Sequence, residues 1–287
     1  MKTILLLLTI TTGILFPYGH EYTFLIRYFL MAMLFFSFLD VKVNKEIITK
    51  KHFVILFTII ISASLIFILI NPFSSELAQT AFITAIAPTA IAAPVITSLK
   101  RKKVEFVAFS LLLNNFVIAS LIPFMLPVVV QNQADISITD VLFPILITFS
   151  IPFISAQLLK VLSKKIWTWL VNWKDVSFYI LIINIYIATS DASNYVQSEF
   201  SNNLGIIFLI AASSALLCIF FFGLGWIIGS KNYHHEASQS LGQKNNAFTI
   251  WLSLTYMNPI SAIGPVFYVF FQNLYISYEL HKHRHEK

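Results

Sequence analysis

Long apolar segments recur along the whole chain and are separated by short polar ones. Their residues do not alternate between apolar and polar, as they would in the strands of a membrane barrel. They stay apolar for about 18 to 25 residues, the length that a helix needs to cross a hydrocarbon layer of about 30 Å. We therefore predict an all-α polytopic membrane protein with ten transmembrane helices. The predicted spans cover residues 3–17, 23–40, 53–71, 75–99, 103–130, 138–160, 176–197, 203–229, 237–257 and 261–280.

The composition excludes a soluble globular domain, because 57% of the 287 residues are hydrophobic and only 11% are charged. The formal net charge of +6 does not indicate nucleic-acid binding, since the basic residues fall in short clusters between apolar runs. No span contains a His-Glu-x-x-His or Gly-x-Ser-x-Gly motif. We therefore expect no enzyme activity, no metal and no cofactor.

The basic residues predict how the chain lies in the membrane. Of the 19 lysines and arginines, all except Arg27 and Lys244 fall on one side of the predicted spans. By the positive-inside rule both termini are expected in the cytoplasm, in the inner membrane of a bacterium. Arg27 lies near the outer end of the second span and is expected to extend toward that interface. The segment before Pro17 resembles a signal peptide without a cleavage site, so we interpret it as the first helix.

Ten spans divide into two halves of five, residues 1–130 and 131–287. An odd number of spans in each half means that the second half is inserted upside down relative to the first. Many secondary transporters have this plan, and their binding sites lie where spanning helices are interrupted near the middle of the bilayer. The fourth and ninth spans are the corresponding pair in the two halves.

Both of these spans contain residues that interrupt a helix. The fourth, ELAQTAFITAIAPTAIAAPVITSLK, has Pro88 and Pro94 in its middle, and each proline removes a backbone hydrogen bond. The ninth, EASQSLGQKNNAFTIWLSL, is interrupted by Gly242 and the polar residues 243–246. We therefore predict that helices 4 and 9 are discontinuous and cross each other.

Polar residues near the two predicted breaks favour an anionic ligand. The next span in each half carries an amide pair at mid-depth. The second part of a broken helix begins with free N–H groups that carry partial positive charge, and Lys244 adds a full charge with no Asp or Glu nearby in these spans. We expect the site to bind a small organic anion such as a carboxylate or sulfonate. The candidate substrate-binding residues are Thr89, Asn114, Asn115, Lys244, Asn245, Asn246, Gln272 and Asn273.

Each of these features has a simpler interpretation. Lys244 could extend to the cytoplasmic interface, Pro88 and Pro94 could be packing kinks, and the amides could only bond helix to helix. Asp191 in the seventh span has two interpretations as well: it lies at the outer interface, or it lines the cavity and carries a coupling proton. The helix-breaking residues and the amide pairs occur at similar depth in both halves, and this coincidence favours a functional site.

At these residues the chain resembles the bile acid:sodium symporter superfamily. The resemblance is clearest over residues 76–123 and in LGQKNNAFTIWLSLTYMNPISAIGPVFYVFFQNLYIS. The family's Glu-x-Gly-x-Gln-Asn motif corresponds to Ser240, Gly242, Lys244 and Asn245 here, of which Gly242 and Asn245 are identical. It implies a panel domain of spans 1, 2, 6 and 7 that moves against a core domain of spans 3–5 and 8–10, with substrate in the crevice between them.

The chain departs from this family at the positions that would bind sodium. Most of them lack a side-chain oxygen for a hard cation; they are Ala93, Pro94, Val107, Leu111, Ser240 and Lys244. We expect the Lys244 ammonium to stand in place of sodium. Titration of this amine is one way to couple transport to protons, and the coupling ion stays open between a proton and sodium. Two alternatives stay open: a sodium-coupled symporter with a non-standard site, and a transport-inactive sensor or accessory subunit.

Overall fold

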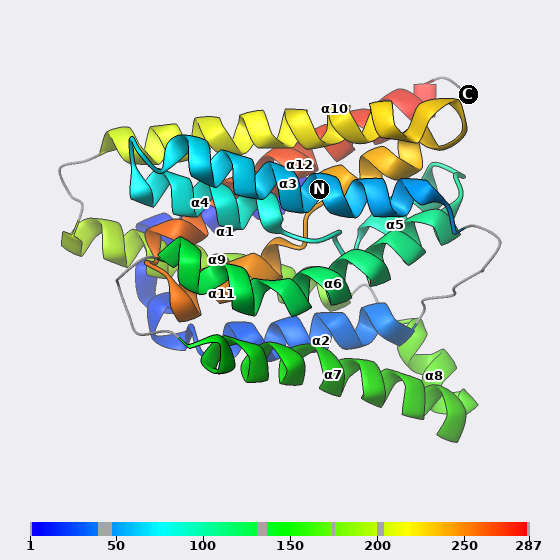
Figure 1. The fold of residues 1–287 in the computed structure, drawn as a ribbon. Helices are drawn as coiled ribbons and strands as arrows, with labels where there is room; N and C mark the ends of the chain where they lie inside the picture. The colour runs from blue at the N-terminus through cyan, green and yellow to red at the C-terminus, as the bar shows by residue number, and fades with distance from the viewer. Residues whose placement is uncertain (1, 40–47, 131–136, 174–175, 200–203, 286–287) are drawn as a thin grey trace.

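The computed structural model describes residues 2–39, 48–130, 137–173, 176–199 and 204–285, and these residues are almost entirely helical. The helices run roughly parallel or antiparallel to one another (Figure 1). They are α1 (Lys2–Leu15), the 3-10 helix η1 (Pro17–Tyr22), α2 (Leu25–Leu39), α3 (Lys50–Ile70), α4 (Ser75–Ile86), α5 (Ala93–Leu99), α6 (Val104–Val130), α7 (Ile138–Leu162), α8 (Lys164–Val171), α9 (Val176–Glu199), α10 (Leu204–Gly242), α11 (Asn246–Tyr256) and α12 (Ile260–His285).

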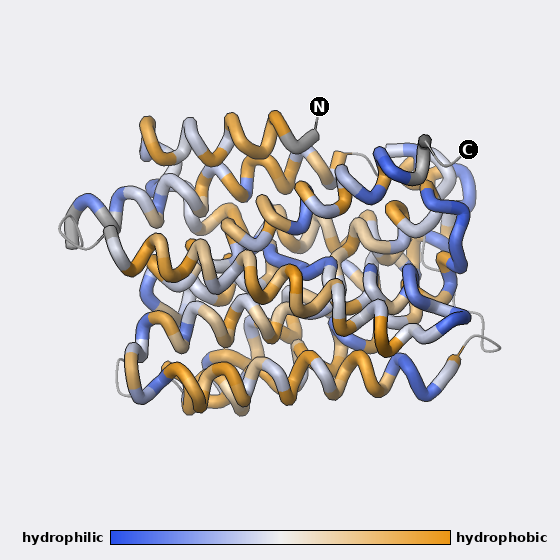
Figure 2. The backbone as a smooth tube through the Cα atoms, turned by 90° about the horizontal axis from the view of Figure 1, so that it is seen from above, coloured by the Kyte–Doolittle hydropathy of each residue, from blue (hydrophilic) through white to orange (hydrophobic). Residues whose placement is uncertain are grey.

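Six of the described helices are long and apolar enough to cross a membrane: α3, α6, α7, α9, α10 and α12. The chain is apolar along most of each helix and hydrophilic mainly near the helix ends (Figure 2). The expectation of an all-helical, multi-pass membrane protein is therefore confirmed within the described residues.

Two groups of helices pack mainly within themselves. In the first group α2 packs against α7 and α9, and α1 packs against α9 and η1. In the second group α3 packs against α4, α5 against α6, and α12 against α4, α10 and α11. The groups meet where α6 contacts α7, where α12 contacts α9 and α1, and where α11 contacts α2 and α9. A buried apolar core joins the helices of both groups.

The long helix α10 is two antiparallel arms rather than one span. Its backbone leaves the helical conformation at Ser230 and Tyr233, where the chain turns back on itself. The arms then approach so closely that a Cβ atom on Gly225 would lie 2.6 Å from the Ala237 carbonyl oxygen. The first arm corresponds to the predicted eighth span and the second begins the predicted ninth.

Most of the clustered basic residues lie at one end of the bundle, which is to the right in Figure 1. We call this the basic end; the described residues there include Lys50, Lys51, Lys100, Arg101, Lys102, Lys103, Lys160, Lys164, Lys165 and Lys231. Lys42, Lys45, Lys174 and Lys287 lie outside the described residues. The short helix α8, which the apolar runs do not predict, follows α7 at the same end, and its Trp167 Nε1 donates to the Leu39 carbonyl.

Candidate functional site

Two extended segments cross in the middle of the second helix group. Residues 87–92 separate α4 from α5, and residues 243–245 separate α10 from α11. Thr89 and Lys244 form an antiparallel bridge. On either side of it the Ala90 amide donates to the Gln243 carbonyl over 2.8 Å and the Asn245 amide donates to the Pro88 carbonyl over 2.7 Å. Backbone groups that are buried away from water need hydrogen-bond partners, and each interrupted segment supplies partners for the other.

The local sequence explains why the helices stop here. Pro88 has no amide hydrogen to donate to the preceding turn and disfavours helical geometry in the residue before it, and Ala87 accordingly has a ψ of 128°. Pro94 has a different role from the one predicted. It lies in the first turn of α5, where a missing amide hydrogen costs nothing, so it begins a helix and does not interrupt one.

Gly242 is the last residue of the second arm of α10, and its neighbours leave no room for a side chain at this position. A Cβ atom at this position would lie 2.4 Å from the Phe222 ring on the first arm. Its carbonyl accepts a hydrogen bond from the buried Tyr268 hydroxyl of α12 over 2.8 Å. The glycine therefore lets the chain reach the crossing point while packed against both neighbouring helices.

Amides from α6 hold the first crossing segment. Asn114 Nδ2 donates to Thr89 Oγ1 over 2.7 Å, and Asn115 Nδ2 donates to the Thr89 carbonyl over 2.8 Å. Asn115 Oδ1 also accepts from Asn245 Nδ2 over 3.0 Å, so one side chain contacts both segments. Thr89 Oγ1 donates in turn to the Ser240 carbonyl over 2.6 Å. All of these side chains are buried.

An amide from α12 holds the second crossing segment in a similar way. Gln272 Oε1 accepts from the Lys244 backbone amide over 3.0 Å. The adjacent Asn273 is not part of this arrangement, because its Nδ2 donates to the Val269 carbonyl of its own helix and its side chain is half-buried. Of the predicted amide pair on this helix, only Gln272 reaches the crossing.

The Lys244 side chain is enclosed within the bundle, with 1% of its surface exposed. Its Nζ donates to the Ala85 carbonyl over 2.9 Å and lies 3.8 Å from the centre of the Phe221 ring. Ala85 is in the last turn of α4, whose free carbonyls carry partial negative charge. Among the described residues no carboxylate pairs with this ammonium. Lys244 therefore does not extend to the cytoplasmic interface. Its amine bonds to one of the free carbonyls at the end of α4, where the helix is interrupted.

The first turn of α11 starts at the crossing, where two buried side-chain oxygens have no partner among the described residues. Asn245 Oδ1 caps this helix by accepting from the Phe248 amide over 3.4 Å. Asn246 Nδ2 donates to the Lys244 carbonyl over 3.1 Å. In the described part of the chain, the buried oxygens Asn246 Oδ1 and Asn114 Oδ1 accept no hydrogen bond. They could accept from a hydroxyl or amide hydrogen of a bound molecule.

The first helix group supplies one polar residue that the apolar pattern does not single out. Asn184 of α9 is fully buried, and neither atom of its amide has a partner among the described residues. Such a side chain is costly inside a protein. Asp191 is expected from the sequence either at the outer interface or in the cavity as a proton carrier. It lies further along α9, where it is half-buried and near His20 of η1. The structure does not place it among the residues of the crossing.

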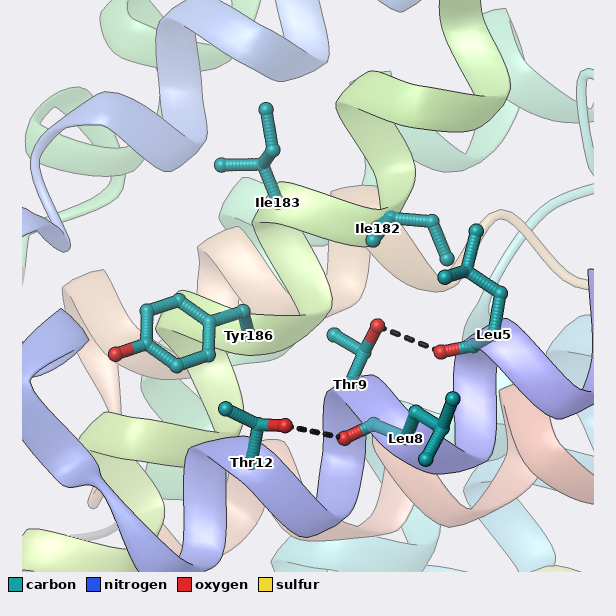
Figure 3. A pocket seen from close by; sticks show the side chains of 7 residues that line it. All are labelled: Leu5, Leu8, Thr9, Thr12, Ile182, Ile183 and Tyr186. Atoms are coloured by element: carbon teal, nitrogen blue, oxygen red, sulfur yellow. Dashed lines mark hydrogen bonds between the residues drawn. The ribbon is translucent and has the colours of Figure 1, made fainter.

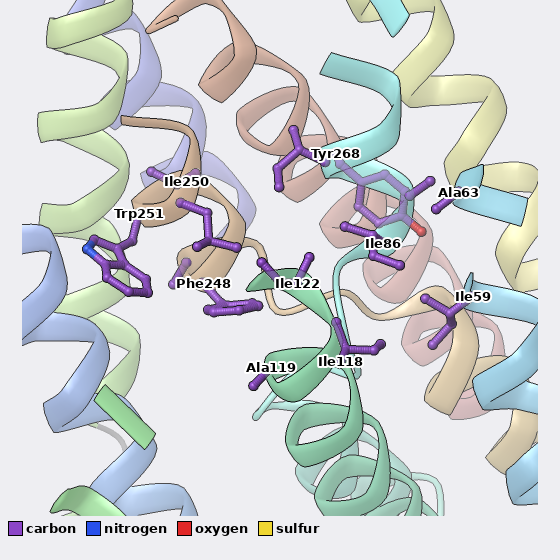
Figure 4. Close-up of a cluster of buried hydrophobic side chains, with 14 of the residues drawn as sticks. Ile59, Ala63, Ile86, Ile118, Ala119, Ile122, Phe248, Ile250, Trp251 and Tyr268 are labelled. Carbon is purple, nitrogen blue, oxygen red and sulfur yellow. The ribbon is translucent and has the colours of Figure 1, made fainter. Parts of the chain in front are cut away.

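The surroundings of the crossing are apolar. Ile86, Ile118 and Ile122 lie around it, and Phe248 and Trp251 lie on the α11 side (Figure 4). A separate cavity of about 320 Å³ lies between α1 and α9 and is lined mainly by Leu, Ile and Tyr side chains (Figure 3). The Thr9 and Thr12 hydroxyls in this cavity donate to carbonyls of their own helix, so neither has a free hydrogen for an anion.

In comparisons with known proteins, no protein-family model matches this chain, and no curated protein matches it significantly.

Proposed function

We propose that this protein is a secondary transporter that carries a small organic anion across a lipid bilayer by alternating access. The observation that carries the proposal is the crossing of two interrupted segments deep inside a bundle of apolar helices, with a buried ammonium and no partner carboxylate among the described residues. Non-helical backbone at membrane depth is tolerated only where protein buries it or where it lines a cavity, and in transporters it marks substrate sites.

In this proposal the protein has ten spans in two inverted repeats. The interrupted pairs α4 with α5, and the second arm of α10 with α11, are the fourth and ninth spans. The similar roles of Asn115 and Gln272 support this, because each belongs to the helix that follows a break and each holds the segment at that break. The first helix group is then the moving panel and the second is the core, as in the bile acid:sodium symporter superfamily.

The electrostatics of the crossing favour a negative ligand. The α11 N-terminus faces the crossing with a partial positive charge, to which Lys244 adds a full charge in its protonated form. Because the ammonium is already bonded to Ala85, its effect on a ligand is a field and not a direct contact. The free oxygens of Asn114 and Asn246 accept hydrogen bonds, so in this proposal they orient the ligand through a hydroxyl or amide hydrogen and not through its anionic group.

The same geometry favours transport without sodium. The Lys244 ammonium occupies the carbonyl of Ala85, a backbone oxygen of the kind that a sodium ion would require. A fixed positive charge of the protein thus replaces the mobile cation of a sodium symporter. A proton on one of the titratable groups is the coupling ion in this proposal.

The test is transport by purified protein in proteoliposomes. Radiolabelled acetate, pyruvate, succinate, citrate and isethionate are supplied outside, with and without a sodium gradient and with and without a pH gradient. We expect uptake of at least one of these anions that a pH gradient drives and a sodium gradient does not. Binding of the anions without any flux would instead identify a sensor, and strict dependence on sodium would refute the role given to Lys244.

A further inference from the structure

Arg27 is the second basic residue that departs from the charge pattern of the chain, and the structure buries much of it. It lies in the first turn of α2, at the end of the bundle opposite the basic end. Its Nε donates to Thr148 Oγ1 over 3.0 Å, and its Nη2 donates to the Pro144 carbonyl over 3.2 Å, both on α7. The expectation that Arg27 extends toward the outer interface is therefore wrong.

The guanidinium lies well inside the bundle. Thr148 is fully buried and is ten residues past the start of α7, which places it about 15 Å from that end at the helical rise per residue. A hydrocarbon layer is about 30 Å thick. Arg27 thus holds a charge between the opposite end and mid-depth, where charged side chains are costly and commonly mark the path of a substrate or ion.

Three other enclosed cations among the described residues contact a carboxylate or the carbonyls at the end of a helix, and Arg27 contacts neither. Lys100 pairs with Glu279 over 3.0 Å. Lys51 donates to the Ile228 and Gly229 carbonyls, which end the first arm of α10, and Lys244 similarly donates to the end of α4. Arg27 donates only to a hydroxyl and a carbonyl within α7. Among the described residues it has no carboxylate partner, and its Nη1 donates no hydrogen bond.

An aromatic ring completes the environment of this charge. The Arg27 Cζ lies 5.8 Å from the centre of the Trp251 ring. Trp251 is on α11, and in Figure 4 it projects from that helix toward the neighbouring helices of the first group. Because α11 begins at the crossing, Trp251 is five residues, or about 7.5 Å, further along the helix. Arg27 therefore lies beside the middle of α11, the helix that begins at the crossing.

We propose that Arg27 binds the carboxylate of the transported anion at a site between α2, α7 and Trp251, before the anion reaches the crossing. This inference rests on the proposed transport function and adds a specific recognition residue to it. A guanidinium has five N–H donors in one plane, and α7 uses one on Nε and one on Nη2. One hydrogen on Nη2 and both on Nη1 remain, which together form a planar fork that matches a carboxylate. The unused Nη1 donors are oriented before the ligand arrives.

The experiment compares anion binding by the wild type with that by Arg27→Gln, Arg27→Lys and Lys51→Gln. Purified protein in detergent without phospholipid is titrated with acetate, succinate, citrate, isethionate and methylphosphonate, and Kd is obtained from the shift in Tm. We expect a carboxylate to bind the wild type, with affinity reduced by about 30-fold or more in Arg27→Gln and by about tenfold in Arg27→Lys, which keeps the charge but loses the fork. Lys51→Gln removes another half-buried cation; it should lower Tm with affinity unchanged.

The outcomes separate this inference from the transport proposal. If anions bind the wild type and both Arg27 variants equally, Arg27 only ties α2 to α7, and the inference is wrong while transport stands. If no anion stabilises the wild type, both proposals fail. If phosphatidylglycerol stabilises the wild type in an Arg27-dependent way and the carboxylates do not, Arg27 binds a lipid phosphate and the inference is also overturned. If Arg27→Gln does not fold, the affinities of Arg27→Lys and Lys51→Gln are compared instead. Equal affinities in these two variants would refute the inference.

Discussion

Replacing Asn115 by leucine tests whether the crossing is held by side-chain amides. In the structure this one amide donates to the Thr89 carbonyl and accepts from Asn245 Nδ2, so it bonds both interrupted segments. Leucine has nearly the same shape but leaves both of those groups buried without their partner. Each such loss costs about 1 to 3 kcal/mol, so the free energy of unfolding should fall by about 2 to 6 kcal/mol.

The matched control is Asn273→Leu, in the second half of the chain. Asn273 is half-buried and bonds only to a carbonyl of its own helix, so its replacement should cost about 1 kcal/mol or less. Both variants and the wild type are unfolded thermally in the same detergent. We expect Asn115→Leu to lower Tm by roughly 5 to 15 °C and Asn273→Leu to lower it by much less. An equal or larger loss in Asn273→Leu would refute the geometry described for the crossing.

Three further substitutions test other features of the fold, each by thermal unfolding against the wild type. Gly242→Ala should lower stability by about 1 to 3 kcal/mol, because its Cβ would meet the Phe222 ring at 2.4 Å, whereas Gly223→Ala, whose Cβ would meet nothing within 4 Å, should not. Ser230→Gly should raise it by about 1 kcal/mol, since φ 53° and ψ −169° suit glycine alone; an unchanged Tm would argue against this turn. Asn184→Leu should raise it by about 1 to 3 kcal/mol by removing an unpaired buried amide, and a loss of stability would show that this amide has a partner.

The helical, membrane-spanning character of the chain could be predicted from sequence, because it depends on the length of apolar runs alone. The position of the interruption at Pro88 follows from the same kind of local argument, since a missing amide hydrogen acts wherever the proline lies. Pro94 shows the limit of that argument. It has the same chemistry, but its effect depends on whether a helix is already in progress at that point, and here one begins.

The direction of each side chain could not be predicted in the same way. Gln272 and Asn273 are adjacent on one helix and therefore point about 100° apart, so only one of them reaches Lys244. Hydropathy places a residue at a depth but does not say which neighbour it faces. For this reason the pattern predicted the wrong environment for Arg27 and did not single out Asn184, which lies in an apolar run.

Alternating access requires that water reach the crossing from each side of the membrane in turn. Cys218 is the one cysteine in the chain, so Cys218→Ser gives a background in which a single cysteine can be placed by Asn246→Cys at the start of α11, with Ala63→Cys in the buried core as the control. A membrane-impermeant maleimide is applied to either face of proteoliposomes. We predict that Asn246→Cys is labelled from both faces and is protected by the transported anion, while Ala63→Cys is labelled from neither. No labelling of Asn246→Cys from one of the faces would contradict alternating access at this site.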